Sequence, residues 1–352
     1  MMGAGILLLF LASGLTACRT EQQETTAVSL AALPSEEEDA GGLFLSGRIR
    51  NETEVIRGIR KGLHDNAAEI TVSFRYGEDI FTELNAVIEA WMEAALSETE
   101  DPAEGDYIRY QYGGYTWKSS RDRLDDGYLY TVEITPGYYS YRKWEDAVTE
   151  ETDRILRSLF REEACREAEY GIQPAASAEL QTGGQAAGPA ELQPGRLAAE
   201  LPEAERIRRI YDYICSTVTY DAVHGKNPYD HRKSTAYWAL IEHTAACQGY
   251  CTAMYRLLRE AGVNCRIVTG TAGNDAGEHP EELHAWVIAE ADGRYYNLDP
   301  TWDSGHEEYR WFLKGETDFP EHVREERFLR EPFLSGYPMA ETALTAQPGG
   351  GK

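Results

Sequence analysis

Three features are missing from this sequence, and each absence excludes a class of protein. Basic residues are scarce: 34 Lys and Arg stand against 60 Asp and Glu, which gives a net charge of -26 over 352 residues. Such a surface repels nucleic acid, so we expect no nucleic-acid partner. The apolar run Ile6–Leu11 is too short to cross a bilayer. His279 and His284 do not form a His-Glu-x-x-His motif, so a metalloprotease is not indicated.

A complete disulfide framework is also missing. The apolar run ends in Leu15-Thr16-Ala17-Cys18, which resembles a bacterial lipobox, where a Cys after small residues is lipidated. We therefore expect residues 1–18 to be a signal peptide, and the protein to be exported and anchored by lipid on Cys18 to the outer face of the cell membrane. The alternative is a chance Cys after an ordinary signal peptide, and no Lys or Arg precedes the run. The other five cysteines are odd in number, so at least one free thiol is expected; pairing of Cys165, Cys215, Cys251 and Cys265 stays open.

The first half of the chain divides into a tether and a small domain. Residues 19–45 are acidic and have no periodic apolar face, which is typical of a tether. Residues 46–168 predict a small α+β domain in which we find no chemistry. Apolar residues alternate or recur at helical spacing there in the order strand, helix, strand, strand, helix, at residues 70–74, 81–96, 107–115, 128–134 and 155–159.

The second half opens with a segment rich in Ala, Gly, Pro and Gln. Residues 169–201 have almost no large apolar side chain, so a linker is favoured over an ordered insertion. Residues 202–335 then predict a second α+β domain, and residues 336–352 a flexible tail. An amphipathic helix over residues 203–218 opens this domain, and strands are expected at residues 265–269, 285–289, 295–298 and 309–313.

Cys247 stands just before a helical pattern that closes at Gly262, so the spacing places this thiol at a helix N-terminus. Unpaired N–H groups and the macrodipole favour a thiolate there. The N–H of Cys247 and those of the first turn are natural donors to the oxyanion of a tetrahedral intermediate. Cys247 is therefore the candidate nucleophile.

His284 and Asp299 flank an Asp292-Gly293 pair, which is a strong hairpin signal. A two-residue loop would make His284 and Asp299 diagonal neighbours on one face of the hairpin, and a four-residue loop would place them directly opposite each other. A loop of odd length would send them to different faces. The hairpin therefore predicts that an imidazole and a carboxylate meet.

These residues resemble the three motifs of bacterial transglutaminase-like domains. The motifs are Cys247-Gln248-Gly249-Tyr250, His284-Ala285-Trp286 and Leu298-Asp299-Pro300-Thr301-Trp302-Asp303, with similar flanking features at Tyr220-Asp221 and Tyr309–Leu313. The resemblance covers residues 202–333. It implies a papain-like α+β fold in which Cys247 attacks an amide carbonyl, His284 moves the proton and Asp299 holds the imidazole, with no metal and no cofactor.

The expected function is that of an exported cysteine peptidase or transglutaminase-like acyltransferase, acting on amide bonds of peptides, proteins or cell-wall material, with hydrolysis slightly favoured. The alternative is a binding or scaffolding lipoprotein with a vestigial triad. Cys251, one turn after Cys247, could pair or compete with it, and a zinc set of Cys247, Cys251, Cys265 and His284 is a weaker alternative. Four aromatic residues are candidates for a substrate groove or, equally, for core packing: Tyr250, Trp238, Trp286 and Trp302.

Overall fold

The computed structural model describes residues 18–19, 51–161, 198–199, 201–221, 231–273 and 282–344. Apart from Cys18 and Arg19, the predicted signal peptide and the tether lie outside these residues, as do most of the linker and Cys165. In the part of the chain that is described, no helix combines the length and the hydrophobicity needed to cross a membrane.

The chain forms two compact units. The first comprises Met1–Glu145 with His224–Thr235, and the second comprises Asp146–Val223 with Ala236–Lys352. The division differs from the boundary predicted at residue 168, because it falls within helix α4 (Arg142–Leu159). Most of α4 belongs to the second unit, where Thr149 accepts a hydrogen bond from Arg256 at 3.4 Å.

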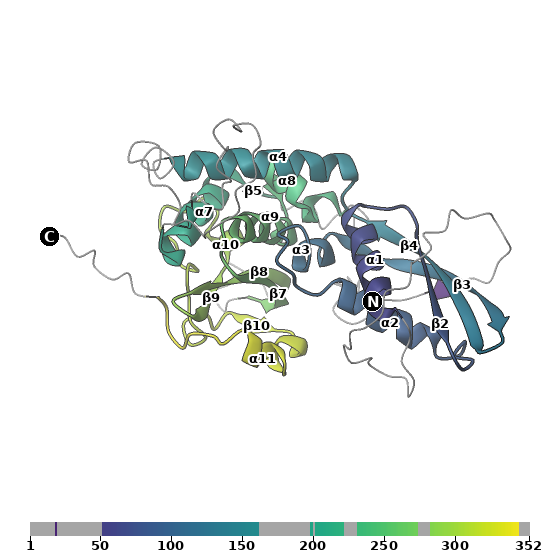
Figure 1. The fold of residues 1–352 in the computed structure, drawn as a ribbon. Coiled ribbons are helices and arrows are strands. Elements are labelled where there is room, and N and C mark those ends of the chain that lie inside the picture. The colour runs from purple at the N-terminus through teal and green to yellow at the C-terminus, as the bar shows by residue number, and fades with distance from the viewer. Residues whose placement is uncertain are drawn as a thin grey trace, which may run out of the picture. The chain divides into compact units, whose positions relative to one another are not determined.

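The first unit is a sheet with helices, as the α+β prediction requires (Figure 1). Its sheet has the order β1-β3-β4-β2, with strands β1 (Cys18–Arg19), β2 (Ile70–Tyr76), β3 (Tyr112–Leu124) and β4 (Gly127–Tyr138). Its helices are α1 (Glu52–His64), α2 (Leu84–Ala95) and α3 (Asp106–Arg109). Alternate residues of β2 are buried, and Phe74 stacks on Tyr130 and meets the edge of Trp91. The strand predicted from residue 107 begins instead at Tyr112, because α3 occupies residues 106–109.

The second unit has an antiparallel sheet of order β10-β7-β8-β9, on which helix α9 packs. The strands of this sheet are β7 (Cys265–Ala272), β8 (Glu282–Ala291), β9 (Arg294–Leu298) and β10 (His322–Arg324). A two-stranded parallel pair is formed by β5 (Thr219–Tyr220) and β6 (Thr244–Ala245). The helices of the second unit are α4, α7 (Glu203–Thr217), α8 (Ala236–Leu240), α9 (Cys247–Glu260), α10 (Pro300–Asp303) and α11 (Phe333–Gly336). A 3-10 turn of this unit lies at Glu326–Leu329, and another, at Arg232–Ser234, belongs to the first unit.

Helix α9 is the central element of the second unit, and its residues from Cys247 to Leu258 are all buried. Its first residue is Cys247 because Ala246 has an extended backbone (ψ 173°) that the helix cannot continue. At the other end, Gly262 has a φ of 72°, and the guanidinium of Arg206 donates to the carbonyl oxygen of Ala261 at 2.8 Å. A cation at this position offsets the partial negative charge of a helix C-terminus. The predicted helix carrying Cys247, packed on an antiparallel sheet, is therefore confirmed.

Two predicted features of the second unit are wrong. Residues 309–313, all of them described, form no strand; the amides of Arg310 and Trp311 donate instead to the carboxylate of Asp303, at 2.8 and 3.0 Å. The predicted flexible tail is ordered as far as Leu344, because residues 338–344 hydrogen-bond to the rest of the unit. Examples are Ala340 N–H to the carbonyl of Tyr295 and Leu344 N–H to the carbonyl of Leu313, at 2.9 and 3.0 Å. Residues 345–352 lie outside the described residues.

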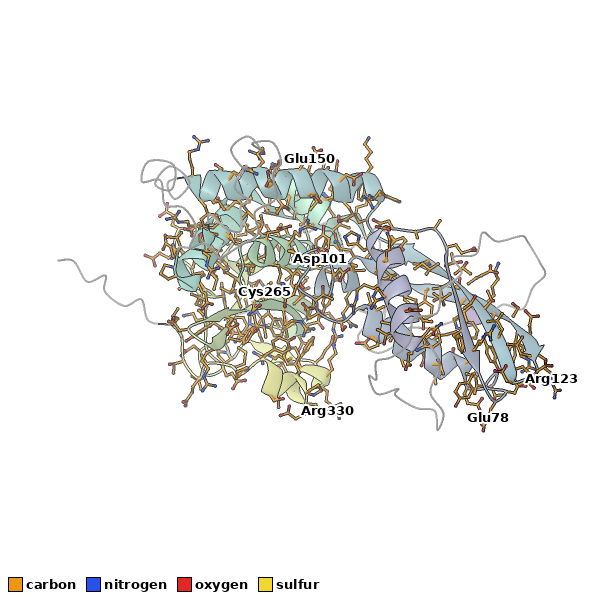
Figure 2. All side chains as sticks on the ribbon, in the orientation of Figure 1. Glu78, Asp101, Arg123, Glu150, Cys265 and Arg330 are labelled. Atoms are coloured by element: carbon orange, nitrogen blue, oxygen red, sulfur yellow. The ribbon has the colours of Figure 1, made fainter. Side chains whose placement is uncertain are left out.

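Figure 2 shows where the side chains concentrate. They crowd the space between the helices and the sheet of the second unit, in the region where Cys265 is labelled. The core there includes Val268, Trp286, Ile288 and Trp302, each less than 10% exposed. The strands that lead to the site are thus held by apolar packing, which fixes the positions of the side chains that they carry.

Candidate active site

The hairpin formed by β8 and β9 has the predicted two-residue loop. Ala291 pairs with Arg294, and the register continues to Val287 opposite Leu298. Both loop residues have positive φ values, 52° at Asp292 and 75° at Gly293, which are the values of a type I′ turn. An even loop keeps His284 and Asp299 on one face of the hairpin, as the sequence predicts.

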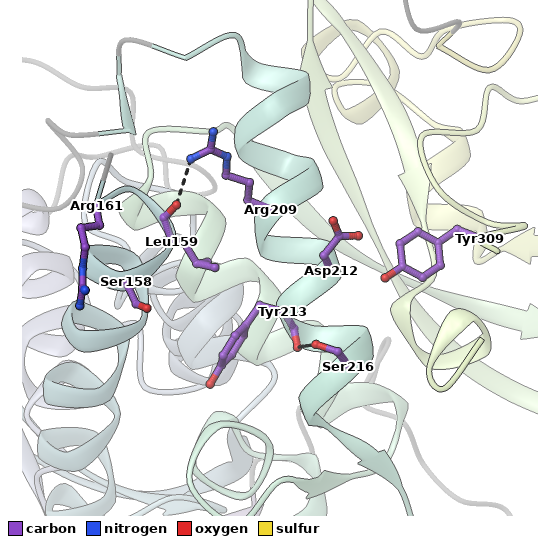
Figure 3. Close-up of a pocket in the computed structure, with 8 residues that line it drawn as sticks. All are labelled: Ser158, Leu159, Arg161, Arg209, Asp212, Tyr213, Ser216 and Tyr309. Carbon is purple, nitrogen blue, oxygen red and sulfur yellow. Dashed lines mark hydrogen bonds between the residues drawn. The ribbon is translucent and has the colours of Figure 1, made fainter. Parts of the chain in front are cut away.

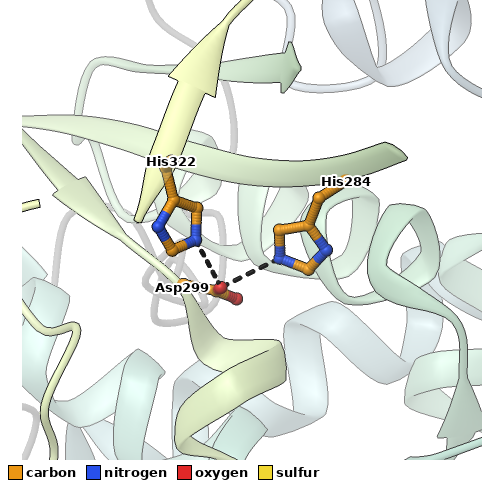
Figure 4. Close-up of side chains that lie close together, drawn as sticks. All are labelled: His284, Asp299 and His322. Carbon is orange, nitrogen blue, oxygen red and sulfur yellow. Dashed lines mark hydrogen bonds and ion pairs between the residues drawn. The ribbon is translucent and has the colours of Figure 1, made fainter. Parts of the chain in front are cut away.

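The imidazole and the carboxylate do meet. Nε2 of His284 lies 2.9 Å from Oδ2 of Asp299, and both side chains are buried, with exposed fractions of 4% and 0% (Figure 4). Because Nε2 is engaged by the carboxylate, Nδ1 is the ring nitrogen left for a second partner. The side chain of Cys247 lies near enough to His284 to contribute to the raised pKa of its imidazole. Cysteine, imidazole and carboxylate therefore adjoin one another in that order.

The other oxygen of Asp299 is fixed by the backbone. Asp299 is the N-cap of α10, and Oδ1 accepts the N–H groups of Thr301 and Trp302 at 3.0 and 3.3 Å. Pro300 at the first helical position suits this cap, since it has no N–H to satisfy. The Asp-Pro-Thr-Trp segment thereby holds the carboxylate plane and leaves Oδ2 directed at the imidazole.

The sequence analysis missed His322, which lies at the first position of β10. Its Nε2 is 2.9 Å from Oδ2 of Asp299, the oxygen that also faces His284 (Figure 4). The ring of His322 stacks on Phe319 with a centroid separation of 3.8 Å and lies 4.5 Å from the ring of Trp302. No motif surrounds His322 in the sequence, and only the pairing of β10 with β7 brings it to the site.

Charge and burial act in opposite directions in this cluster. Burial of the His284 ring lowers its pKa, but the charge of Asp299 and hydrogen bonds to Asp299 and Cys247 outweigh this and raise the pKa to about 10. Burial raises the pKa of Asp299, and the two histidines outweigh it, so the pKa lies well below its usual value. At neutral pH the pair is therefore a carboxylate and an imidazolium, and the positive charge of the imidazolium lies beside Cys247.

The start of α9 supplies the second element of a thiol site. The thiol of Cys247 is 7% exposed, and Ala246 gives no side-chain cap to the helix. The N–H groups of Gly249 and Tyr250 return to the carbonyl of Ala246, at 2.9 and 3.1 Å. The N–H of Cys247 lies ahead of that turn, where an α-helix has no acceptor of its own for it, so it is a natural donor to an oxyanion.

The neighbouring thiols have other environments. Cys215, Cys247 and Cys251 are free and buried. Burial raises the pKa of Cys251 well above its ordinary value, and the charge of Cys247 adds to the rise. Burial likewise raises the pKa of Cys215. These two thiols stay protonated at neutral pH, so they do not compete with Cys247 as nucleophiles.

The alternative zinc set does not converge. Cys265 pairs with Ala289, whereas His284 pairs with Gly270. Five residues of β8 separate these positions, about 16 Å along a strand. The thiol of Cys265 instead contacts the carbonyl of Tyr255 at 3.8 Å. A tetrahedral zinc needs its four ligands around one point, so these four residues cannot share an ion.

A second set of potential metal ligands consists of His284, Asp299 and His322, whose ligand atoms lie within 4.8 Å of one another. Metal-bound histidines almost always donate their second N–H to an acceptor. Nδ1 of His322 is buried and has no hydrogen-bond partner among the described residues. Both imidazoles instead approach one carboxylate oxygen at 2.9 Å, which is hydrogen-bond geometry. The donor set therefore fits a hydrogen-bonded trio better than an ion site.

The four groove candidates are mostly core residues. Tyr250 and Trp286 are fully buried, so they cannot line an open groove, and that prediction is wrong for both. The hydroxyl of Tyr250 donates to the carbonyl of Val218 at 2.7 Å, and the indole of Trp286 donates to Asn297 at 3.1 Å. Trp302 is 7% exposed and packs on His284. Trp238 is partly exposed, and it stays a groove candidate.

Two large side chains of the second unit, Tyr220 and Leu283, are each 43% exposed. Leu283 precedes His284, and the charge of Cys247 contributes, after burial, to a raised pKa of Tyr220. A separate hollow of about 620 Å³ lies along α4 and α7 and is lined by residues such as Arg161, Arg209 and Tyr309 (Figure 3). This hollow contains none of the three predicted site residues.

Comparison with known proteins finds a family match in the part of the chain that carries the site. Residues 193–300 match the sequence model of the transglutaminase-like superfamily, a range that includes Cys247, His284 and Asp299. The kyphoscoliosis peptidases of Mus musculus and Homo sapiens are each 32% identical over 108 residues, which is 29% of this chain and 16% of each relative. A TGase crystal structure aligns with a TM-score of 0.28 at 14% identity, over 66% of this chain and 62% of that one.

Proposed function

Residues 193–300 belong to the transglutaminase-like superfamily, and from that premise we propose that this protein is a thiol enzyme of the cysteine-peptidase type acting on amide bonds. The single observation that carries the proposal is the arrangement at the start of α9. There Cys247 lies near enough to His284 to raise the pKa of its imidazole, and Nε2 of His284 lies 2.9 Å from Asp299. This combination of nucleophile, base and orienting acid is the one that acyl transfer requires.

The proposed reaction starts from the thiolate–imidazolium pair. The sulfur of Cys247 attacks the carbonyl carbon of an amide, and the N–H of Cys247 donates to the oxyanion that forms. His284 then gives its proton to the departing amine while the C–N bond breaks, which leaves a thioester on Cys247. Asp299 keeps the imidazole in the tautomer that faces the sulfur.

The thioester is resolved by water or by a second amine, with His284 taking the proton of the attacking group. Attack by water gives hydrolysis, and attack by an amine gives transamidation. We propose hydrolysis as the main outcome. The substrate is an amide or isopeptide bond of a peptide, a protein or cell-wall material, because these are the amide bonds that an exported enzyme meets.

We further propose that the protein is exported and held at the outer face of the bacterial cell membrane by lipid on Cys18. The support is the short apolar run followed by Leu15-Thr16-Ala17-Cys18. Cys18→Ala should transfer the protein from the membrane fraction to the soluble fraction of cells. Equal membrane content in the wild type and the variant would rule out this anchor.

Labelling with iodoacetamide tests the thiol assignment without knowledge of the substrate. In native protein near pH 7, peptide mass spectrometry should find Cys247 modified much faster than Cys251, because Cys251 is 0% exposed, against 7% for Cys247, and burial keeps its thiol protonated. Cys247→Ala should abolish the fast labelling, and the matched variant Cys251→Ala should keep it. The reverse pattern would overturn the assignment.

The competing proposal is a surface binding protein with a vestigial triad. It predicts slow labelling of Cys247, at the rate of a simple thiol, and no turnover on panels of peptides, glutamine amides and muropeptides. Fast labelling together with release of an amine from any of these panels would exclude it. The arrangement of His284 and Asp299 favours the enzyme, because buried groups with strongly shifted pKa values and a specific charge partner cluster at functional sites.

A further inference from the structure

His322 is a buried titratable group that the proposed reaction does not use. Its side chain is fully buried, and it lies at the start of the short edge strand β10. It approaches Oδ2 of Asp299 at the same distance as His284 does, 2.9 Å. Figure 4 shows the carboxylate between the two imidazole rings.

The protonation of this trio follows from its geometry. An ionised carboxylate has only acceptors, so each imidazole nitrogen that contacts it must carry a hydrogen. His322 therefore donates from Nε2. Burial is the main cause that lowers the pKa of His322, so the ring is neutral and Nδ1 bears a lone pair. A neutral second donor can satisfy Asp299 without adding a charge that would repel protonated His284.

The surroundings of His322 fix its direction. The ring stacks on Phe319 and meets the face of Trp286 at an interplanar angle of 72°. Val323, the next residue, pairs with Thr271 of β7, and His322 pairs with Ala272. Packing on two sides and a strand register on the third leave the N–H of His322 directed at the carboxylate.

We propose that His322 is a positioning residue, which donates a second hydrogen bond to Asp299 and so keeps that carboxylate ionised and aimed at His284. The inference rests on the proposed function and adds a fourth member to its site. A buried carboxylate that loses a donor binds protons more tightly. Without His322, Asp299 would compete for the proton of His284, and fewer molecules would hold the thiolate at Cys247.

Two substitutions of His322 test separately the role of its N–H donor and the role of its aromatic ring. His322→Phe keeps an aromatic ring and removes the N–H, whereas His322→Gln removes the ring and keeps an N–H at similar reach. The rate of iodoacetamide modification of Cys247 should fall about tenfold or more in His322→Phe at pH 7, the effect of losing a hydrogen bond to a charged group. It should stay within about threefold of the wild type in His322→Gln.

The pH profile of the same labelling reaction gives a second readout. In His322→Phe the acid-side loss of Cys247 reactivity should begin at a higher pH than in the wild type, because Asp299 becomes easier to protonate. His322→Gln should keep the wild-type profile. Val323→Ala, which changes an exposed side chain on the same strand and leaves the donor and its packing in place, is the matched control and should also keep it.

The outcomes distinguish the inference from its premise. Slow labelling of Cys247 in the wild type would contradict the proposed function itself. Fast labelling in both the wild type and His322→Phe, or a larger loss in His322→Gln than in His322→Phe, would overturn the role of the donor. If the protein holds one equivalent of tightly bound zinc and removal of the zinc changes the pH profile of Cys247 labelling, His322 is a metal ligand and not a positioning residue. If His322→Phe does not fold, His322→Met serves as the variant without the donor.

Discussion

At the scale of single residues, Asp299 connects the most groups in the candidate site. One oxygen accepts two backbone amides and the other faces two imidazoles. A carboxylate with these partners is held in one rotamer and one charge state, which is why the N-cap position of a short helix can serve an active site. The residue links the start of α10 to the first residues of β8 and β10.

Asp299→Asn tests the charge of this residue. The substitution keeps the shape and removes the negative charge, so burial of His284 is no longer opposed and the pKa of its imidazole should fall. The rate of iodoacetamide labelling at Cys247 near pH 7 should drop about a hundredfold or more, as expected when an orienting acid loses its charge. A drop of less than threefold would contradict the assigned role.

The matched control is Asp292→Asn. Asp292 lies in the hairpin turn with a φ of 52°, a conformation that Asn tolerates and that type I′ turns favour. The same chemical change at this position should leave the labelling rate unaltered. Comparison of the two variants separates the charge at the site from the loss of one acidic group on a chain of net charge -26.

At the scale of elements, the contact between β7 and β10 decides whether His322 reaches the site. Gly270 of β7 pairs with both His284 of β8 and Arg324 of β10. A Cβ at Gly270 would clash with the carbonyl oxygen of Val323. The absence of a side chain at Gly270 is thus a condition for close pairing of β10 beside β7.

Gly270→Ala should displace β10 and lower the free energy of unfolding by about 1–3 kcal/mol, the usual cost of overpacking. Urea denaturation measures the loss, and labelling of Cys247 should slow because His322 moves with β10. Gly336→Ala is the control, because a Cβ there meets nothing within 4 Å and the backbone has no positive φ. Equal stability of the two variants would show that β10 adapts freely.

At the scale of the whole molecule, the ionisable groups buried in the second unit set its response to pH. Burial is the first cause of the raised pKa values of Cys251, Cys215, Tyr211 and Tyr250. These groups ionise near their ordinary values, about 9 to 10, in the unfolded chain only. Above that range the unfolded state binds fewer protons than the native state, so stability falls as the pH rises.

The His284–Asp299 pair makes the stability of the fold depend on pH on both the acid and the alkaline side. The raised pKa of His284 gives stability that is complete below about pH 6.5 and is lost as the pH approaches about 10. The lowered pKa of Asp299 gives stability that is present above pH 3.8 and is lost as the pH falls. Asp303, whose pKa burial raises, acts in the opposite sense to Asp299.

The urea midpoint should therefore be highest between about pH 5 and 6.5, decline above that range as the contribution of His284 is lost, and fall more steeply above about pH 9. Tryptophan fluorescence across pH 3 to 11 follows the transition. Cys251→Ala removes one of the buried acids, so it should reduce the alkaline slope while leaving the acid side unchanged. A midpoint that stays constant from pH 9 to 11 would contradict this account.

Much of the second unit was predictable from local patterns. The Asp292-Gly293 turn needs positive φ at two positions, and this requirement fixes an even loop and the shared face of His284 and Asp299. The start of α9 was predictable because an apolar period of 3.6 begins at Cys247 and ends before Gly262. Both signals are local, since each depends on fewer than about twenty consecutive residues.

The failures have a common physical cause. The segment at residues 309–313 has a strand-like composition, but the carboxylate of Asp303 takes the amides of Arg310 and Trp311. Only single backbone contacts are then left, such as Asp299 N–H to the carbonyl of Trp311, and no continuous ladder forms among these residues. Tyr250 and Trp286 are aromatic in any context, and only tertiary packing makes them core instead of groove. The order of residues 338–344 likewise depends on acceptors far away in sequence, such as Leu313.

The sequence by itself determined the α+β class, the helix that begins at Cys247 and the hairpin that joins His284 to Asp299, because short-range periodicity and turn stereochemistry specify each of them. Tertiary structure alone decided the place of His322, 23 residues after Asp299, on a three-residue strand that no pattern announces. Pairing between distant strands depends on the whole packed sheet, and a single chain segment does not carry that information.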